Sequence, residues 1–125
     1  EAIGWTEALK WLNDVDIKSE HKRILDSARW LAKQLRELGM TVYGRHDEND
    51  AAVVSFLHPT MNSEDLAHLL DARGFAVRTG HHCAQPLLDR LEITGTVRVS
   101  LYFYNTHDEV VSFVDYFNEI LERFA

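Results

Sequence analysis

Cysteine is nearly absent from this sequence, with Cys83 the only one in 125 residues. A single thiol cannot form an internal disulfide, so we expect a reducing compartment, the cytoplasm in the simplest case. No stretch approaches the ~20 apolar residues of a transmembrane helix, and the first residues lack the basic and apolar segments of a signal peptide. The sequence therefore argues against a secreted, disulfide-stabilised protein and against a membrane protein.

Positive charge is also scarce. Lysine and arginine together number 13, against 20 aspartates and glutamates, for a formal net charge of −7. Nucleic acids and anionic membranes both bind clustered lysine and arginine. We therefore expect neither as a partner.

The remaining composition, 46% hydrophobic and 26% charged, is that of an ordinary globular domain. Apolar residues at helical spacing predict five helices, over residues 1–12, 18–38, 62–72, 85–91 and 106–124. Runs rich in β-branched and aromatic residues predict three strands, over residues 51–57, 75–78 and 96–102. A polar surface loop is expected over residues 44–50.

Local signals support several of these boundaries. Asn62 or Ser63 can cap the third helix, Pro86 suits the first turn of the fourth, and Thr106 with Glu109 forms a capping box. A strand–helix–strand unit, one more strand and several amphipathic helices predict an α+β fold, an α/β sandwich. Its small sheet, of three strands or slightly more, is covered by helices on one face, with two N-terminal helices added.

The most informative segment is Arg78-Thr79-Gly80-His81-His82-Cys83-Ala84-Gln85-Pro86. Thiolate is the reactive form of cysteine, and a helix N-terminus or a nearby cation favours it. Cys83 directly precedes a predicted helix, and His81 and His82 can add charge or accept the thiol proton. Gly80 provides a hinge before them. This pattern favours sulfur chemistry.

Two arginines are placed to assist that chemistry. Arg78 closes one predicted strand, and Arg98 lies within another. A guanidinium group binds a carboxylate at two points. A nucleophile with a carboxylate clamp suggests an amino acid or another small acid as substrate.

Two other interpretations of the segment stay open. A lone cysteine is often an inert small hydrophobe, and adjacent histidines are often ordinary loop residues. Seven histidines also raise the possibility of a zinc site. However, contiguous side chains such as those of His81, His82 and Cys83 diverge, so further ligands would be needed. Those ligands would come from His58, His68 and His107.

The segment from Gly74 to Leu87 resembles the active-cysteine loop of cysteine desulfurases of the SufS/CsdA type, which are pyridoxal-phosphate enzymes related to class V aminotransferases. Two further segments resemble the same family. Val97-Arg98-Val99-Ser100, followed by Tyr104-Asn105-Thr106, is similar to its arginine strand and the start of its last helix. Residues 1–12 are similar to the helix that links its large domain to its small one.

The resemblance implies a role for each residue of the segment. Cys83 is the nucleophile that takes sulfur from L-cysteine, leaving alanine and an enzyme persulfide. Arg98 binds the substrate carboxylate, and Arg78 is a second active-site arginine. Thr79, Gly80, His81 and His82 form the active-site loop. The resulting sulfur serves iron–sulfur cluster assembly or other sulfur transfer.

The resemblance also implies a division of the chain. Residues 1–16 are expected to be the linker helix, and residues 17–125 the C-terminal small domain. Pyridoxal phosphate, the family's cofactor, binds a lysine in a histidine-lysine motif of the large domain. The chain's four lysines, Lys10, Lys18, Lys22 and Lys33, do not match that motif. We expect a fragment that is inactive by itself.

Partners follow from the same resemblance. Family members are homodimers, although this fragment is expected to be monomeric. Glu64 stands where desulfurases serving SufU-type acceptors carry a histidine, which favours a SufE-like acceptor. Three alternative functions remain: a stand-alone persulfide carrier or interaction module, a selenocysteine lyase domain, and a structural domain with an incidental thiol.

Overall fold

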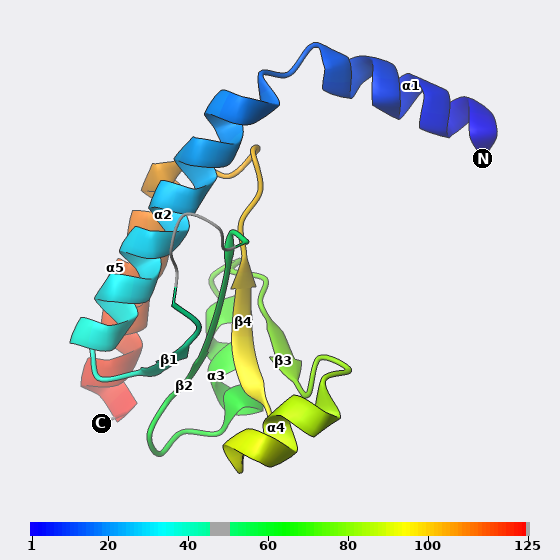
Figure 1. Cartoon of the computed structure of the whole chain (residues 1–125). Coiled ribbons are helices and arrows are strands. Elements are labelled where there is room, and N and C mark those ends of the chain that lie inside the picture. Colours follow the sequence, from blue (N-terminus) through cyan, green and yellow to red (C-terminus); the bar gives the residue numbers. More distant parts are fainter. Residues whose placement is uncertain (46–50, 125) are drawn as a thin grey trace.

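A computed structural model describes residues 1–45 and 51–124, so most of the loop predicted over 44–50 lies outside the described residues (Figure 1). In chain order the elements are α1 (Ala2–Asn13), α2 (Ile17–Glu37), β1 (Thr41–Tyr43), β2 (Val53–Leu57), α3 (Ser63–Asp71), β3 (Arg78–Gly80), α4 (Gln85–Leu91), β4 (Thr96–Ser100) and α5 (His107–Phe124).

The strands form one antiparallel sheet in the order β1-β2-β4-β3. β4 therefore lies between β2 and β3, and the predicted strand–helix–strand unit is split by the last strand of the chain. β2 and β3 are parallel to each other because each is antiparallel to β4. This arrangement brings β3, which leads into Cys83, beside β4, which carries Arg98.

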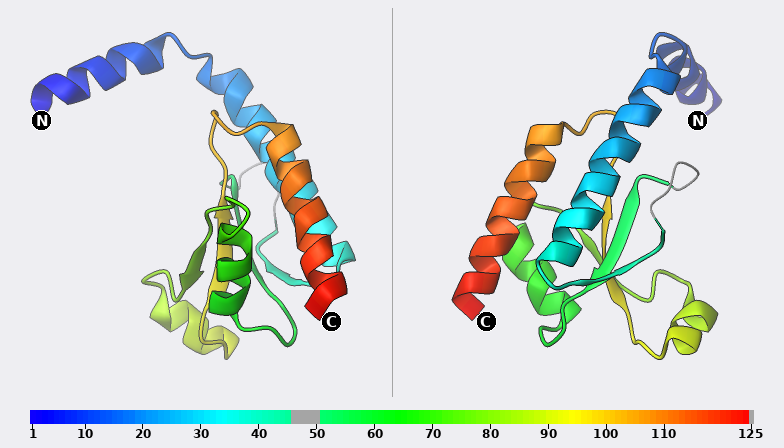
Figure 2. Two further views of the ribbon diagram at one scale, coloured as in Figure 1. Left: turned by 180° about the vertical axis from the view of Figure 1, so that it is seen from behind. Right: turned by 60° about the vertical axis from the view of Figure 1, so that its left-hand side comes forward.

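Three helices, α2, α3 and α5, cover one face of the sheet (Figures 1 and 2). Alternate residues of the central strands point toward them and are buried: Val54 and Phe56 of β2, and Val97 and Val99 of β4. The predicted α+β fold, with helices on one face of a small sheet, is confirmed. The opposite side, called the open face below, has no such cover among the described helices. The expectation of two added N-terminal helices holds for α1 only, because α2 buries its apolar stripe against β1, β2 and α5.

Local sequence signals set the helix ends as expected. Asn62 Oδ1 accepts a hydrogen bond from the backbone N–H of Glu64, so Asn62 is the N-cap of α3. Thr106 and Glu109 exchange both bonds of the predicted capping box, at 3.2 and 2.7 Å. Gly39, with φ +85°, ends α2 in the left-handed conformation that glycine adopts most easily.

The strand predicted over residues 75–78 was wrong in its position. Pairing begins only at Arg78, and β3 continues to Gly80. Phe75 instead turns its ring onto those of Phe113 and Tyr116, at 5.5 and 6.1 Å. A pocket of about 270 Å³ lies between residues 74–77 and the end of β4, so the two backbones have separated there.

The other two predicted strands were too long by two residues each, because β2 begins at Val53 and β4 ends at Ser100. A clamp from α2 holds the chain after β4 away from the sheet. Arg23 donates to the backbone carbonyls of Asn105 and Phe103, at 2.7 and 2.5 Å. β1 was not predicted, since three residues give too short a pattern.

α1 extends away from the rest of the molecule (Figure 2). None of its residues is buried, and Trp5 is 74% exposed. Its described contact with the body is the ring of Trp11, 5.2 Å from that of Phe103. Among the described residues, no helix is both long and apolar enough to cross a bilayer.

Candidate functional site: the cysteine loop and the arginine pair

The open face carries a row of side chains at one level of the sheet. Tyr43 pairs with Ser55, Ser55 with Arg98, and Arg98 with Arg78. Side chains of paired residues lie on the same face. The sheet therefore sets the two arginines, twenty residues apart in sequence, side by side.

Neither arginine is neutralised by the described part of the chain. No ion pair or hydrogen bond joins the side chain of Arg78 or Arg98 to any residue in 1–45 or 51–124, and Nε of Arg98 is buried without a partner. Like charges directly opposite each other in a sheet are destabilising. A pair kept in this arrangement fits an anion that binds both guanidinium groups.

Removing one charge of the pair should therefore stabilise the fold. We expect Arg78→Gln to raise the free energy of unfolding by about 0.2–1 kcal/mol at low salt, because it relieves the repulsion. The gain should shrink in 1 M salt, where charges are screened. Urea unfolding at both salt concentrations measures it. Lys22→Gln, at an exposed cation of α2, is the matched control; an equal gain there would refute the repulsion.

The loop that follows β3 has an unusual backbone. His82 and Cys83 have φ values of +52° and +59°, and Gly80 has +102°. A non-glycine residue in the left-handed region costs on the order of 1–3 kcal/mol, and such residues cluster at functional sites. Two in succession expose the thiol: Cys83 is free and exposed, directly before Ala84, the N-cap of α4.

His82 anchors this loop to the sheet. Its Nε2 lies 3.0 Å from Oγ1 and 3.1 Å from the carbonyl oxygen of Thr96. A carbonyl oxygen can only accept, so Nε2 donates to it and carries the ring proton. Thr96 and Arg98 are two residues apart on one strand and share the open face. The ring of His82 therefore lies next to the arginine pair.

Burial lowers the pKa of His82 below its ordinary value, and the charges of Arg98, Arg78 and His81 lower it further. The hydrogen bond to the Thr96 carbonyl acts in the opposite direction. His82 is therefore neutral at pH 7 and does not supply the positive charge that the sequence suggested. Its Nδ1, buried and without a described partner, is a free acceptor.

The other loop residues have simpler positions. Nδ1 of His81 accepts a hydrogen bond from the backbone N–H of Cys83, at 3.1 Å, which stabilises the turn. Thr79 pairs with Val97 and Gly80 with Thr96 in the β3–β4 ladder. The structure thus brings Arg78 and His82 together with Arg98 at one end of the open face, and Cys83 follows His82 in the loop, whereas Thr79 is paired with the core residue Val97 and points to the helical face.

Sequence reasoning missed two residues here, Gly95 and Thr96. A Cβ on Gly95 would lie 2.9 Å from the carbonyl carbon of Gly80, so the two backbones touch. A glycine directly before a strand was the available signal, since it often marks a close backbone approach. Thr96, only 4% exposed, gave no signal because its partner lies in the loop.

The histidines considered for zinc lie in separate places. Nδ1 of His58 accepts from the backbone N–H groups of Thr60 and Met61, at 3.1 and 2.8 Å. It thus stabilises the turn before α3, and burial lowers its pKa. His68 is on α3, and His107 begins α5 against Trp30. In residues 1–45 and 51–124, no three His, Cys, Asp or Glu side chains gather as metal ligands.

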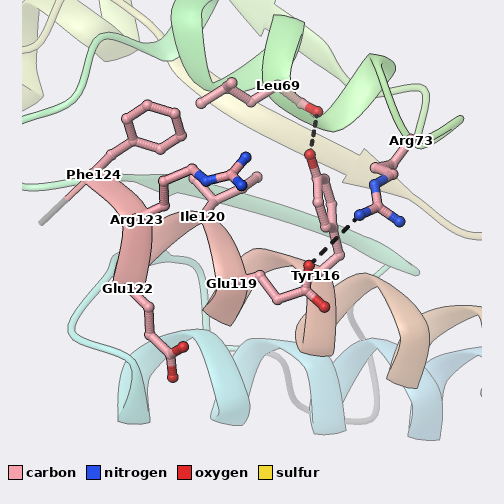
Figure 3. A pocket seen from close by; sticks show the side chains of 8 residues that line it. All are labelled: Leu69, Arg73, Tyr116, Glu119, Ile120, Glu122, Arg123 and Phe124. Carbon is pink, nitrogen blue, oxygen red and sulfur yellow. Dashed lines mark hydrogen bonds and ion pairs between the residues drawn. The ribbon is translucent and has the colours of Figure 1, made fainter.

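A pocket of about 450 Å³ lies between α3 and α5, on the helical side (Figure 3). Tyr116 donates to the backbone carbonyl of Leu69, at 3.1 Å, and Arg73 pairs with Glu119 at 3.8 Å. Arg73 also lies 4.9 Å from the centre of the Tyr116 ring. These contacts join the two helices, and the sheet separates them from the open face.

Comparisons of sequence and of structure with known proteins both lead to the same family. The aminotransferase class-V family model matches residues 1–113. A probable cysteine desulfurase of Halalkalibacterium halodurans is 42% identical over 110 residues, which are 87% of this chain and 27% of that protein. One of Staphylococcus aureus (strain COL) is 32% identical over 126 residues, covering 100% of this chain and 30% of that protein.

Solved structures agree. The cysteine desulfurase CsdA of Escherichia coli superposes with a TM-score of 0.89 at 32% identity, over 98% of this chain and 30% of that one. The apo cysteine desulfurase of Thermococcus onnurineus NA1 gives 0.78 at 35% identity, over 82% and 26%. The chain thus spans less than a third of the length of these relatives. It belongs to the class-V aminotransferase family and, within that family, is similar to the cysteine desulfurases.

Proposed function

We propose that this chain carries the sulfur-accepting part of a cysteine desulfurase site, with Cys83 as the nucleophile. One observation carries the proposal: the exposed thiol lies on a strained loop anchored beside two arginines that have no acidic partner among the described residues. The similarity of the chain to cysteine desulfurases supports the same proposal.

The step at Cys83 is nucleophilic attack by the thiolate on a divalent sulfur. The bond between Sγ and the donor sulfur forms, the donor's bond to that sulfur breaks, and its electron pair leaves with the donor. With L-cysteine as donor, the pair stays on the carbon fragment, which takes a proton to become alanine. Arg98, with Arg78, holds the substrate carboxylate by charge-assisted hydrogen bonds.

Pyridoxal phosphate, when bound to the whole enzyme, supplies the electron sink for the carbon fragment. The residues described do not fit the covalent attachment of that group. All four lysines of the sequence lie on α1 and α2. Neither helix contributes to the open face. The proposal therefore places the cofactor lysine outside these 125 residues, and the chain alone should not release alanine from cysteine.

The finer assignments belong to the same proposal. A SufS/CsdA type and supply of iron–sulfur assembly in the cytoplasm follow from the resemblance of the cysteine loop. A SufE-like acceptor is favoured because Glu64, exposed in the first turn of α3, stands where desulfurases that serve SufU-type acceptors carry a histidine. The whole enzyme would be a homodimer, with α1 leading toward its large domain.

Competition between two alkylating reagents tests the site. Iodoacetate carries a carboxylate and iodoacetamide does not. The arginine pair should draw the anion to Cys83, so the iodoacetate-to-iodoacetamide rate ratio should exceed that of glutathione by about three- to tenfold. Arg98→Gln should lower the ratio, whereas Lys22→Gln on α2 should not. If Cys83 gave the same rate ratio as glutathione, the proposal that the arginine pair binds a carboxylate beside Cys83 would be contradicted.

A further inference from the structure

We propose that Gly95 and Thr96, at the start of β4, form a seat for the cysteine loop, and that Thr96 positions Cys83 by holding the ring of His82. This inference rests on the proposed function, since it says how the nucleophile is kept in place. Neither seat residue belongs to the loop. Both act on Cys83 through other residues.

The first observation concerns Thr96. Its side chain is on the open face, where strand residues are generally more exposed, yet only 4% of it is accessible. Both of its oxygens lie within 3.1 Å of Nε2 of His82. One ring nitrogen thus has two acceptors on one residue, which fixes where the ring lies and how it is turned.

The second observation concerns Gly95. A Cβ there would meet the carbonyl carbon, Cα and carbonyl oxygen of Gly80, at 2.9 to 3.0 Å. Gly80 pairs with Thr96 in the ladder and itself requires the left-handed conformation. Both residues of this contact are therefore required to be glycine. Their backbones, at the start of the loop and at the start of β4, are in direct contact.

The loop needs such a support because of its backbone. His82 and Cys83 are both left-handed, a conformation that an unsupported chain populates rarely. The bond from the Cys83 N–H to His81 lies within the loop and moves with it. Among the described residues, the hydrogen bonds from His82 to Thr96 join a side chain of the loop to the sheet. Loss of the Thr96 hydroxyl should therefore let the loop relax.

The charged groups around His82 give the seat a spectroscopic signature. Arg98, Arg78 and His81 face the ring, and all three disfavour a second proton on it. While seated, His82 is neutral, with its proton on Nε2. Once released into water, the ring exchanges between tautomers and its pKa rises toward the ordinary value.

Nitrogen NMR on the full ¹⁵N-labelled chain tests the seat in three variants. Thr96→Val keeps the shape but removes the hydroxyl, Thr96→Ser keeps the hydroxyl, and Thr41→Val makes the same change on β1 at the far edge. Thr96→Val leaves the backbone carbonyl as the remaining acceptor for Nε2 and removes the hydroxyl, so we expect the ring to be held less firmly and its signals to move part of the way toward the averaged pattern of exposed His21. Solvent exchange of the Cys83 amide should be about three- to tenfold faster. Thr96→Ser and Thr41→Val should match the wild type.

Each outcome decides the question. The seat is refuted if Thr96→Val leaves both signals unchanged, or if Thr96→Ser behaves like Thr96→Val. Should Thr96→Val fail to fold, the wild type suffices, because a His82 ring without a fixed Nε2–H tautomer refutes the seat directly. The alkylation ratio of Cys83 is a separate readout. A fixed His82 with no preference for iodoacetate would reject the proposed function and leave the seat standing.

Discussion

Replacing Cys83 by serine should abolish sulfur uptake by this chain completely. A reduced sample exposed to inorganic polysulfide should gain one sulfur atom at Cys83, detected by mass spectrometry of the peptide and removed by dithiothreitol. The variant should gain none, because a serine hydroxyl stays protonated and is a poor nucleophile without a dedicated base.

Stability provides the control for this variant. The side chain of Cys83 is exposed, so Cys83→Ser should change the free energy of unfolding by no more than about 0.5 kcal/mol. A loss of sulfur uptake at unchanged stability would then be chemical in origin. Sulfur retained by the serine variant, on any residue, would contradict the assignment of Cys83 as the nucleophile.

Truncating Phe117 to alanine should remove about 3–5 kcal/mol from the free energy of unfolding, the largest effect on stability expected for this chain. Phe117 lies on α5 and is fully buried. Its ring meets that of Phe56 on β2 edge to face, at 5.6 Å, and stacks on Phe113 at 6.0 Å. The substitution removes both ring contacts and leaves a cavity between the helix layer and the sheet.

Urea unfolding followed by circular dichroism measures this loss. The matched control is Phe124→Ala in the last turn of the same helix, where the ring is 52% exposed. That change should cost well under half as much, because less apolar area leaves contact. Equal losses at the two positions would show that α5 does not hold the sheet through Phe117.

The core and the site are linked by strand alternation. Phe56 and Val97 are register partners that point into the core, whereas their neighbours Ser55 and Arg98 point to the open face. A slip of one residue in β4 would turn Arg98 into the core, and the same slip in β2 would turn Phe56 out of it. Burial of Phe56 against Phe117 therefore fixes the register that sets Arg98 beside Arg78.

Local interactions account for what could be predicted from the sequence. The apolar stripes of α2 and α5, the N-cap at Asn62 and the capping box at Thr106 each depend on residues within a few positions of one another. Those elements, and the α+β class that they imply, were predicted close to their observed bounds. The single cysteine and its unusual surroundings identified the loop for the same reason.

Long-range contacts decided the rest. Insertion of β4 between β2 and β3 pairs Arg78 with Arg98, and no local pattern encodes which strands become neighbours. The clamp of Arg23 on residues 103 and 105 ends β4, and Phe75 packs against α5 instead of pairing, so β3 begins only at Arg78. The sequence by itself determined the helices, their caps and the position of the single exposed cysteine. Only the tertiary structure decided the register, the neutral His82 and the hold of Thr96 on it, because each depends on side chains that meet only after the chain has folded.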